Sequence, residues 1–147
     1  MFYPSINDVT TTPEAPPAFV ALAGPSANKG RDMGYPPGNM AVQRRAYGDL
    51  APLALAKTPA AVFPAAAAAA KAMTRWTVVS EDAAAARIEA VAVTLLMRYR
   101  DDIAIEVRAT SGGCAVHVRS KSRLGRGDFG ANAKRIRAYL SALGASL

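Results

Sequence analysis

Positive charge gathers near the C-terminal end of this 147-residue chain. Seven Lys and Arg residues lie between positions 119 and 137, where Asp128 is the one acidic residue. Guanidinium groups, hydroxyls and the start of a predicted helix are suitable ligands for a carboxylate or phosphate group. The candidate site for a small anion or an acidic partner consists of Arg119, Ser120, Ser122, Arg123, Arg126, Asn132 and Arg135.

The same segment also has a structural interpretation. Asp128 would cap the helix that follows and would place a negative charge where an anion would otherwise sit. The two serines could satisfy backbone groups of the loop. The internal acidic partners available to the arginines are Asp101, Asp102 and Glu106. Sequence patterns alone leave both interpretations open.

Residues suited to catalysis are few. His117 is the single histidine, and no nucleophile-elbow motif surrounds the neighbouring Ser120 or Ser122. One Cys excludes an internal disulfide and a cysteine metal cage. The spacing Gly125-x-Gly127-x-x-Gly130 matches a dinucleotide fingerprint, but it follows an antiparallel-looking strand and opens no βαβ unit. We therefore predict no enzymatic activity, no metal site and no cofactor.

The composition of the chain bears on whether the protein binds nucleic acid or spans a membrane. The net charge of +7 is compatible with phosphate binding, but only 7% of residues are aromatic, and apart from Phe129 and Tyr139 they do not interleave with the basic segment. Nucleic acid is therefore not the expected partner. No apolar run approaches the ~20 residues that span a bilayer, and residues 1–9 lack the basic and then hydrophobic pattern of a signal peptide.

Residues 59–147 have the pattern of a small α+β domain. Thr58-Pro59 is a typical helix start, followed by an alanine-rich stretch. Alternating apolar residues predict strands at 76–79, 87–99, 103–108 and 114–119. A turn at Asp101-Asp102 and a hairpin loop at Thr110–Gly113 are predicted between the last three of them. A last helix is predicted over 129–143, with Asp128 as N-cap, Phe129 in the core stripe and Gly144 as the stop. We expect a four-stranded antiparallel sheet flanked by two helices.

Residues 1–58 differ in composition from the rest of the chain. Nine of the ten prolines precede residue 60, which predicts a long extended arm. Solvated linkers seldom carry many large apolar groups, so this arm either wraps its own domain or lies along a partner. The residues predicted to bind a partner are Phe2, Tyr3, Ile6, Val9, Phe19, Tyr35, Tyr47 and Leu53. On the second alternative, deletion of residues 1–55 should leave the domain folded.

Three motifs occur in order along the chain. They are Ile6-Asn7-Asp8-Val9-Thr10-Thr11, then Asp101-Asp102-Ile103, then Arg119-Ser120-x-Ser122-Arg123-x-Gly125-x-x-Asp128-x-Gly130-x-Asn132-x-x-Arg135-Ile136. Together they resemble the family called domain of unknown function 1499 (DUF 1499), over nearly the whole chain. Lys121 departs from that pattern, in which an apolar or small residue is commoner.

The resemblance implies a helper protein more than a catalyst. The family has no established catalytic activity, many bacterial members carry hydrophobic segments before this domain, and plastid members are associated with thylakoids and photosystem assembly. We therefore expect a peripheral, membrane-associated accessory or assembly subunit that docks through its arm on a larger membrane-bound complex, such as a photosynthetic one. The basic segment would face acidic protein or lipid headgroups. The alternative is a binding domain for a small anionic or lipid ligand between the sheet and the C-terminal helix.

Overall fold

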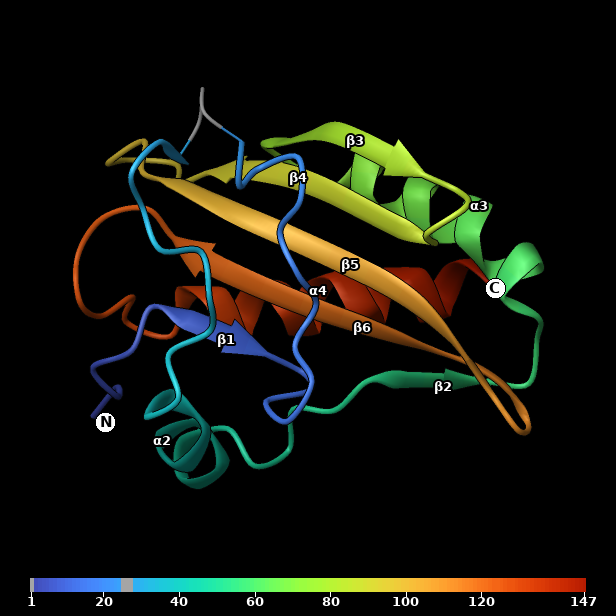
Figure 1. Ribbon diagram of the computed structural model, residues 1–147, viewed down its shortest axis with the longest axis horizontal. Helices are drawn as coiled ribbons and strands as arrows, with labels where there is room; N and C mark the ends of the chain where they lie inside the picture. Colours follow the sequence, from blue (N-terminus) through green and yellow to red (C-terminus); the bar gives the residue numbers. More distant parts are fainter. Residues whose placement is uncertain (1, 25–27) are drawn as a thin grey trace.

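The computed structural model describes residues 2–24 and 28–147 of the chain, and it has a mixed α+β fold (Figure 1). Within these residues the strands are β1 (Asp8–Thr10), β2 (Leu53–Leu55), β3 (Trp76–Asp82), β4 (Arg87–Val93), β5 (Arg100–Thr110) and β6 (Gly113–Ser122). The helices are α2 (Asn39–Ala46), α3 (Pro59–Ala72) and α4 (Ala131–Ser146). The predicted α+β class is confirmed.

All strand pairs are antiparallel, in the order β1-β6-β5-β4-β3, and β2 also pairs with β6. β1 and β2 share one edge of β6: Val9 lies opposite Ser120, and Ala54 lies opposite Ala115. The sheet therefore has six strands, not the predicted four. The two additional strands come from the segment predicted to be an arm, and they lie against β6 because that strand has a free edge.

Helices α3 and α4 cover one face of the sheet (Figure 1). The core on this face joins strand residues such as Ile103 and Val118 to Ile136, Tyr139 and Leu143 of α4, all fully buried. The Tyr139 hydroxyl donates a hydrogen bond of 2.8 Å to the Ala66 carbonyl of α3. Sheet and helices thus meet in a packed interface.

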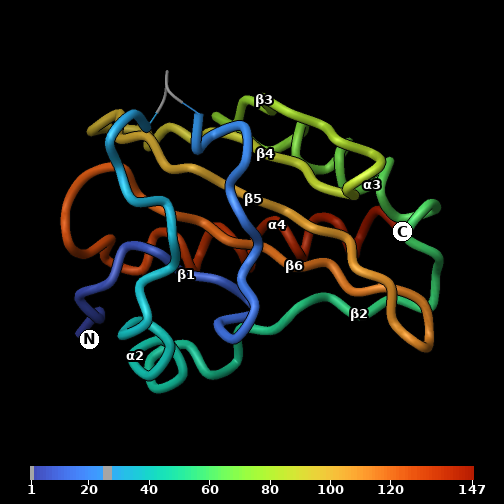
Figure 2. The backbone as a smooth tube through the Cα atoms, in the orientation of Figure 1, coloured from blue at the N-terminus to red at the C-terminus, as the bar shows by residue number. Residues whose placement is uncertain are grey.

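The opposite face of the sheet is covered by residues 11–24 and 28–36, which we call the strap (Figure 2). Glu89 of β4 is 1% exposed, and its carboxylate accepts hydrogen bonds from the backbone N–H groups of Val20, Ala21 and Leu22. Phe19 packs in a second small cluster with Leu22 and residues of the sheet. Burying a carboxylate costs free energy unless hydrogen-bond donors surround it, and these three N–H groups supply the donors. The Glu89 carboxylate therefore fixes the strap over β4.

The first 58 residues are therefore not an extended arm. They supply β1, α2, β2 and the strap, and the core takes in residues from both sides of the boundary predicted at residue 58. Ile6, Val9, Phe19 and Tyr47 are at most 7% exposed. These side chains pack on their own sheet because that sheet has an uncovered face and an unpaired edge. Deletion of residues 1–55 would remove these contacts. Pro25, counted among the prolines of the arm, lies outside the described residues.

Three further predictions need correction. β4 ends at Val93, six residues before the predicted end, because the chain reverses there and β5 begins at Arg100. The Asp101-Asp102 pair, predicted as a turn, lies in β5, where both side chains have arginine partners. Helix α4 begins after Gly130, which has a φ of 77°, and it continues past Gly144 to Ser146. Left-handed φ values favour glycine, so Gly130 sets the start.

Candidate functional site

Arg119 of the predicted anion site is buried and paired inside the chain. Its Nε and NH2 groups donate hydrogen bonds of 2.9 and 2.8 Å to the two carboxylate oxygens of Asp8 in β1. Both side chains are at most 3% exposed. Arg119 also donates to the carbonyls of Pro17 and Met33 in the strap. These contacts leave Arg119 with a structural role.

Two other arginines of the predicted site also have carboxylate partners. Arg123 lies 2.7 Å from Asp102, and Arg135 lies 2.7 Å from Asp101. Burial raises the pKa of the Asp101 carboxyl above its usual value, and the nearby Arg135 charge opposes that rise. The structure therefore favours the internal pairing anticipated from the sequence, and these guanidinium groups are not free for an anion.

The polar residues around these pairs form one network between β6 and α4. Asn132 accepts hydrogen bonds from Ser120 and Arg135, and it donates 2.8 Å bonds to Ser122 and Asp128. The Asp128 carboxylate in turn accepts the backbone N–H groups of Gly130 and Asn132. It therefore satisfies a free N–H group at the start of α4, but the N-cap residue is Gly130 and not Asp128 as predicted. This network fixes the start of α4 over the end of the sheet.

Arg126 differs from the other three arginines of the predicted anion site. It is exposed on the loop between β6 and α4, and within the described ranges it makes no ion pair. The predicted site is thus divided: its buried members hold the fold together, and Arg126 faces outward.

His117 lies on the strap side of β6. Its Nδ1 atom is in hydrogen-bond contact with the Thr12 hydroxyl, whereas Ser120 and Ser122 contact the Asn132 side chain. Burial lowers the pKa of His117 from its usual value of 6.5, and the Arg108 charge acts in the same direction. His117 therefore holds the strap and has no serine as a partner.

Titration of His117 should destabilise the protein below neutral pH. A lowered pKa in the folded state means that the unfolded chain binds the proton more tightly, so the stability that His117 contributes is present above pH 6.5 and is lost as the pH falls. A histidine-selective NMR titration should give a pKa below 6.5, and His117→Gln should flatten the decline of melting temperature between neutral pH and the folded-state pKa. A measured pKa above 6.5 would contradict this assignment.

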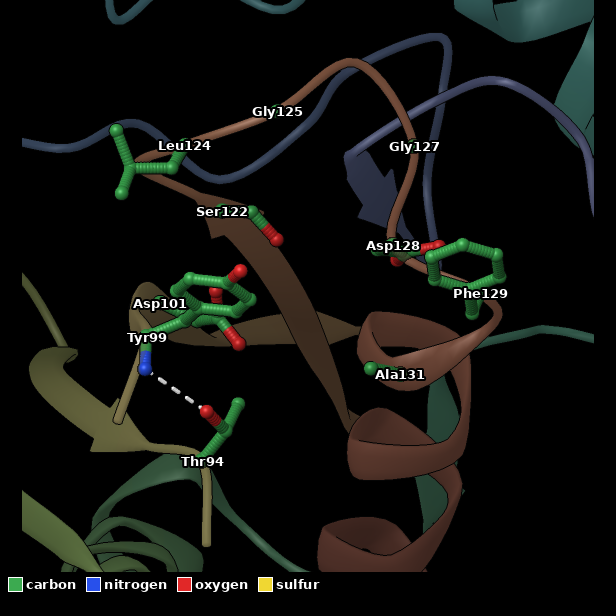
Figure 3. Close-up of a pocket in the computed structure, with 10 residues that line it drawn as sticks. All are labelled: Thr94, Tyr99, Asp101, Ser122, Leu124, Gly125, Gly127, Asp128, Phe129 and Ala131. Carbon is green, nitrogen blue, oxygen red and sulfur yellow. Dashed lines mark hydrogen bonds between the residues drawn. The ribbon is translucent and has the colours of Figure 1, made fainter. Parts of the chain in front are cut away.

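A pocket of about 320 Å³ opens where the sheet ends and α4 begins (Figure 3). Its polar wall carries the side chains of Asp101, Ser122 and Asp128, and Tyr99 and Phe129 lie on opposite sides of the view. The remaining lining residues are Thr94, Leu124, Gly125, Gly127 and Ala131. No basic residue is among them, so the pocket does not have the chemistry of an anion site.

The segments that line or adjoin this pocket carry large apolar side chains that are exposed to solvent. We call this group the apolar end; it consists of Phe2, Leu95, Leu96, Met97, Leu124 and Phe129. The exposed fractions reach 87% for Leu96, 84% for Phe129 and 103% for Phe2. Phe129 also has a φ of 52°, a left-handed conformation that bulky residues rarely adopt. The prediction that Phe129 packs in the core is therefore wrong.

Sequence reasoning missed this surface because it assigned residues 94–99 to a strand and Phe129 to a helix stripe. One signal was available: Leu95, Leu96 and Met97 are three consecutive large apolar residues directly before Arg98, a pattern that suits neither face of a half-buried strand. Of the residues predicted to bind a partner, Phe2 and Tyr3 are exposed, whereas Tyr35 and Leu53 are partly buried.

The described residues contain no helix that is both long enough and apolar enough to cross a bilayer. Comparison with curated proteins found no match. A family profile described as "Protein of unknown function (DUF1499)" matches residues 8–143, a range that includes β1, the pairs Arg119–Asp8, Arg123–Asp102 and Arg135–Asp101, and nearly all of α4. The match extends over nearly the whole chain, and the protein therefore belongs to the DUF1499 family.

Proposed function

We propose that this protein is a non-enzymatic accessory or assembly subunit that associates peripherally with a membrane and docks on a larger membrane-bound complex. The observation that carries the proposal is the apolar end. Monomeric proteins seldom leave several large apolar side chains together in water, and such patches mark interaction surfaces. A photosynthetic complex is one host of this kind, as the family resemblance suggests.

The docking surface in this proposal is the apolar end and not the first 58 residues as a whole. Ile6, Val9, Phe19 and Tyr47 are buried against their own sheet, so they have no surface left for a partner. Phe2 is the one residue of the predicted partner-binding set that also belongs to the apolar end. The docking role thus moves from the arm to loops at one end of the fold.

The non-enzymatic part of the proposal rests on how the reactive groups are used. His117 holds the Thr12 hydroxyl, and Ser120 bonds to Asn132, so His117 does not act as a base on Ser120. In the described part of the chain, no three His, Cys, Asp or Glu side chains gather as a metal site. The groups suited to chemistry are occupied in holding the fold.

The alternative function is a binding domain for a small anionic or lipid ligand. Fewer observations support an anionic ligand than support the docking role. The arginines predicted to hold the anion pair with aspartates, and the sheet–helix interface is packed. The pocket lies at the edge of that interface, and it presents the carboxylates of Asp101 and Asp128.

Native purification from the source cells tests the proposed function. The double variant Leu96→Ser and Phe129→Ser should reduce the amount of co-purifying complex at least about tenfold, because each substitution removes apolar area worth on the order of 1 kcal/mol or more at an interface. Val79→Ser is the matched control, since Val79 is a 47% exposed apolar residue of β3 outside the apolar end. Undiminished co-purification by the folded double variant would refute the proposed docking surface.

A further inference from the structure

We infer that the apolar end inserts into the surface of a bilayer that carries anionic lipids. The inference deepens the proposed function, because it names the partner of the same surface. It rests on three observations: where the exposed apolar side chains gather, which charges accompany them, and how the loops that carry them are built.

The apolar side chains come from three segments that meet at one end of the molecule. Residues 2–7, the loop between β4 and β5 and the loop between β6 and α4 all lie at the left of Figure 1, far from the C-terminus. Phe129 lines the pocket with Tyr99 and Leu124, and its ring makes an edge contact with Tyr3 at a centroid distance of 6.4 Å. Phe2 and Phe129 also line a common depression. Leu95 lines another depression together with Ala131 and Lys134 of α4. The three segments therefore lie next to one another at this end.

The charges at this end are complementary to anionic headgroups. Arg98, Arg100 and Arg126 are exposed and make no ion pair within the part of the chain that the structure describes. The acidic groups beside them are already engaged: Asp101 pairs with Arg135, and Asp128 caps α4. Exposed cations next to exposed apolar groups are typical of surfaces that bind anionic membranes.

The way these loops are built favours a fluid lipid bilayer as the partner over a rigid protein surface. Leu95, Leu96 and Met97 precede Arg98, whose φ of 58° turns the chain back towards β5. Tyr99 follows it and is 45% exposed, as suits an aromatic ring at the boundary between hydrocarbon and water. Separate loop tips can enter lipid without the shape complementarity that a protein interface requires.

This mode of binding orients the molecule. With the apolar end in the headgroup layer, the start of α4 faces the membrane. The hairpin between β5 and β6, at the right of Figure 1, then lies far from the membrane. A host complex embedded in the same bilayer can then contact the rim of the apolar end, so the bilayer and the complex share this surface.

Vesicle binding by the full chain tests the inference. The probes are vesicles of phosphatidylcholine alone and of an equal mixture of phosphatidylcholine and phosphatidylglycerol. We expect binding to the mixed vesicles that weakens about fivefold for Arg98→Gln and for Arg126→Gln, as one lost charge near an anionic surface predicts. Leu96→Ser should weaken it about tenfold. Val79→Ser should bind like the unaltered protein.

A fluorescent label gives a second readout that does not depend on affinity. Cys114 is the single cysteine and is buried, so Leu96→Cys provides one reactive site for an environment-sensitive dye. Its emission should shift to the blue when mixed vesicles are added, and the dye on Val79→Cys should show no such shift. Melting curves establish that each variant is folded.

The outcomes separate the inference from the proposed function. If the folded protein does not bind mixed vesicles, or if Leu96→Ser binds them unchanged, the bilayer inference is wrong. Loss of co-purification in the double variant would then assign the apolar end to a protein partner, and the proposed function would stand. If vesicles bind as expected but no complex co-purifies with the unaltered protein, the bilayer inference stands and the proposed docking on a larger complex is refuted.

Discussion

Arg119→Met is expected to lower the free energy of unfolding by about 3–5 kcal/mol, the usual cost of removing one partner of a buried ion pair. The substitution leaves the Asp8 carboxylate in the interior without its two charged hydrogen bonds. It also removes the donors that hold the carbonyls of Pro17 and Met33. β1 and the strap should therefore detach together. Urea denaturation followed by circular dichroism measures the loss.

Arg137→Met is the matched control for this experiment. Arg137 pairs with Asp49 at 2.8 Å, but the two side chains are 42% and 68% exposed. Exposed pairs contribute at most about 1 kcal/mol, so the control should unfold at nearly the urea concentration of the unaltered protein. Equal effects of the two variants would show that the Arg119–Asp8 pair does not hold the first residues of the chain against β6.

Gly113→Ala is expected to destabilise the protein by roughly 3 kcal/mol or more, through steric overlap combined with backbone strain. Gly113 begins β6 with a φ of 149°, which side chains rarely adopt. A Cβ atom there would overlap the Leu55 carbonyl oxygen and lie 2.8 Å from the Lys57 backbone nitrogen. Since both contacts are backbone atoms, β2 would have to move away from β6. Thermal unfolding measures the effect.

Gly112→Ala tests whether that effect comes from the close approach of β2. Gly112 is the neighbouring residue of the same turn, and an added Cβ would meet no atom within 4 Å. The alanine should therefore change stability by less than about 1 kcal/mol, as surface substitutions usually do. A small effect at Gly113, equal to that at Gly112, would contradict the pairing of β2 with β6.

The features of the fold that the sequence predicted correctly are those that local sequence patterns encode. Thr58 caps α3 through a hydrogen bond from the backbone N–H of Ala61, as the Thr-Pro start indicated. The turn between β5 and β6 falls at the predicted Thr110–Gly113 loop. Alternation along β5 and β6 also identified the face that packs against α3 and α4. It did not reveal that the other face is largely buried as well, beneath the strap. These features depend on residues close together in the chain, so periodicity and capping residues reveal them.

The candidate site was predicted only in part, for a related reason. Asp101 and Asp102 were correctly named among the possible partners of the arginines, because they lie in the neighbouring strand of the same sheet. The partner of Arg119 was missed, because Asp8 is 111 residues away along the chain. No periodic pattern encodes a pairing over that distance.

The sequence by itself determined the α+β class, the family, the central antiparallel strands and the two longest helices. Only the tertiary structure decided what covers the sheet and what remains uncovered. Burial lowers the free energy of any apolar side chain, whether it is Val9 in the core or Phe129 at the surface. Whether it is buried depends on which surfaces are still open when the chain has folded. Val9 is buried because β1 pairs with the free edge of β6. Phe129 faces water because the turn before α4 holds it there.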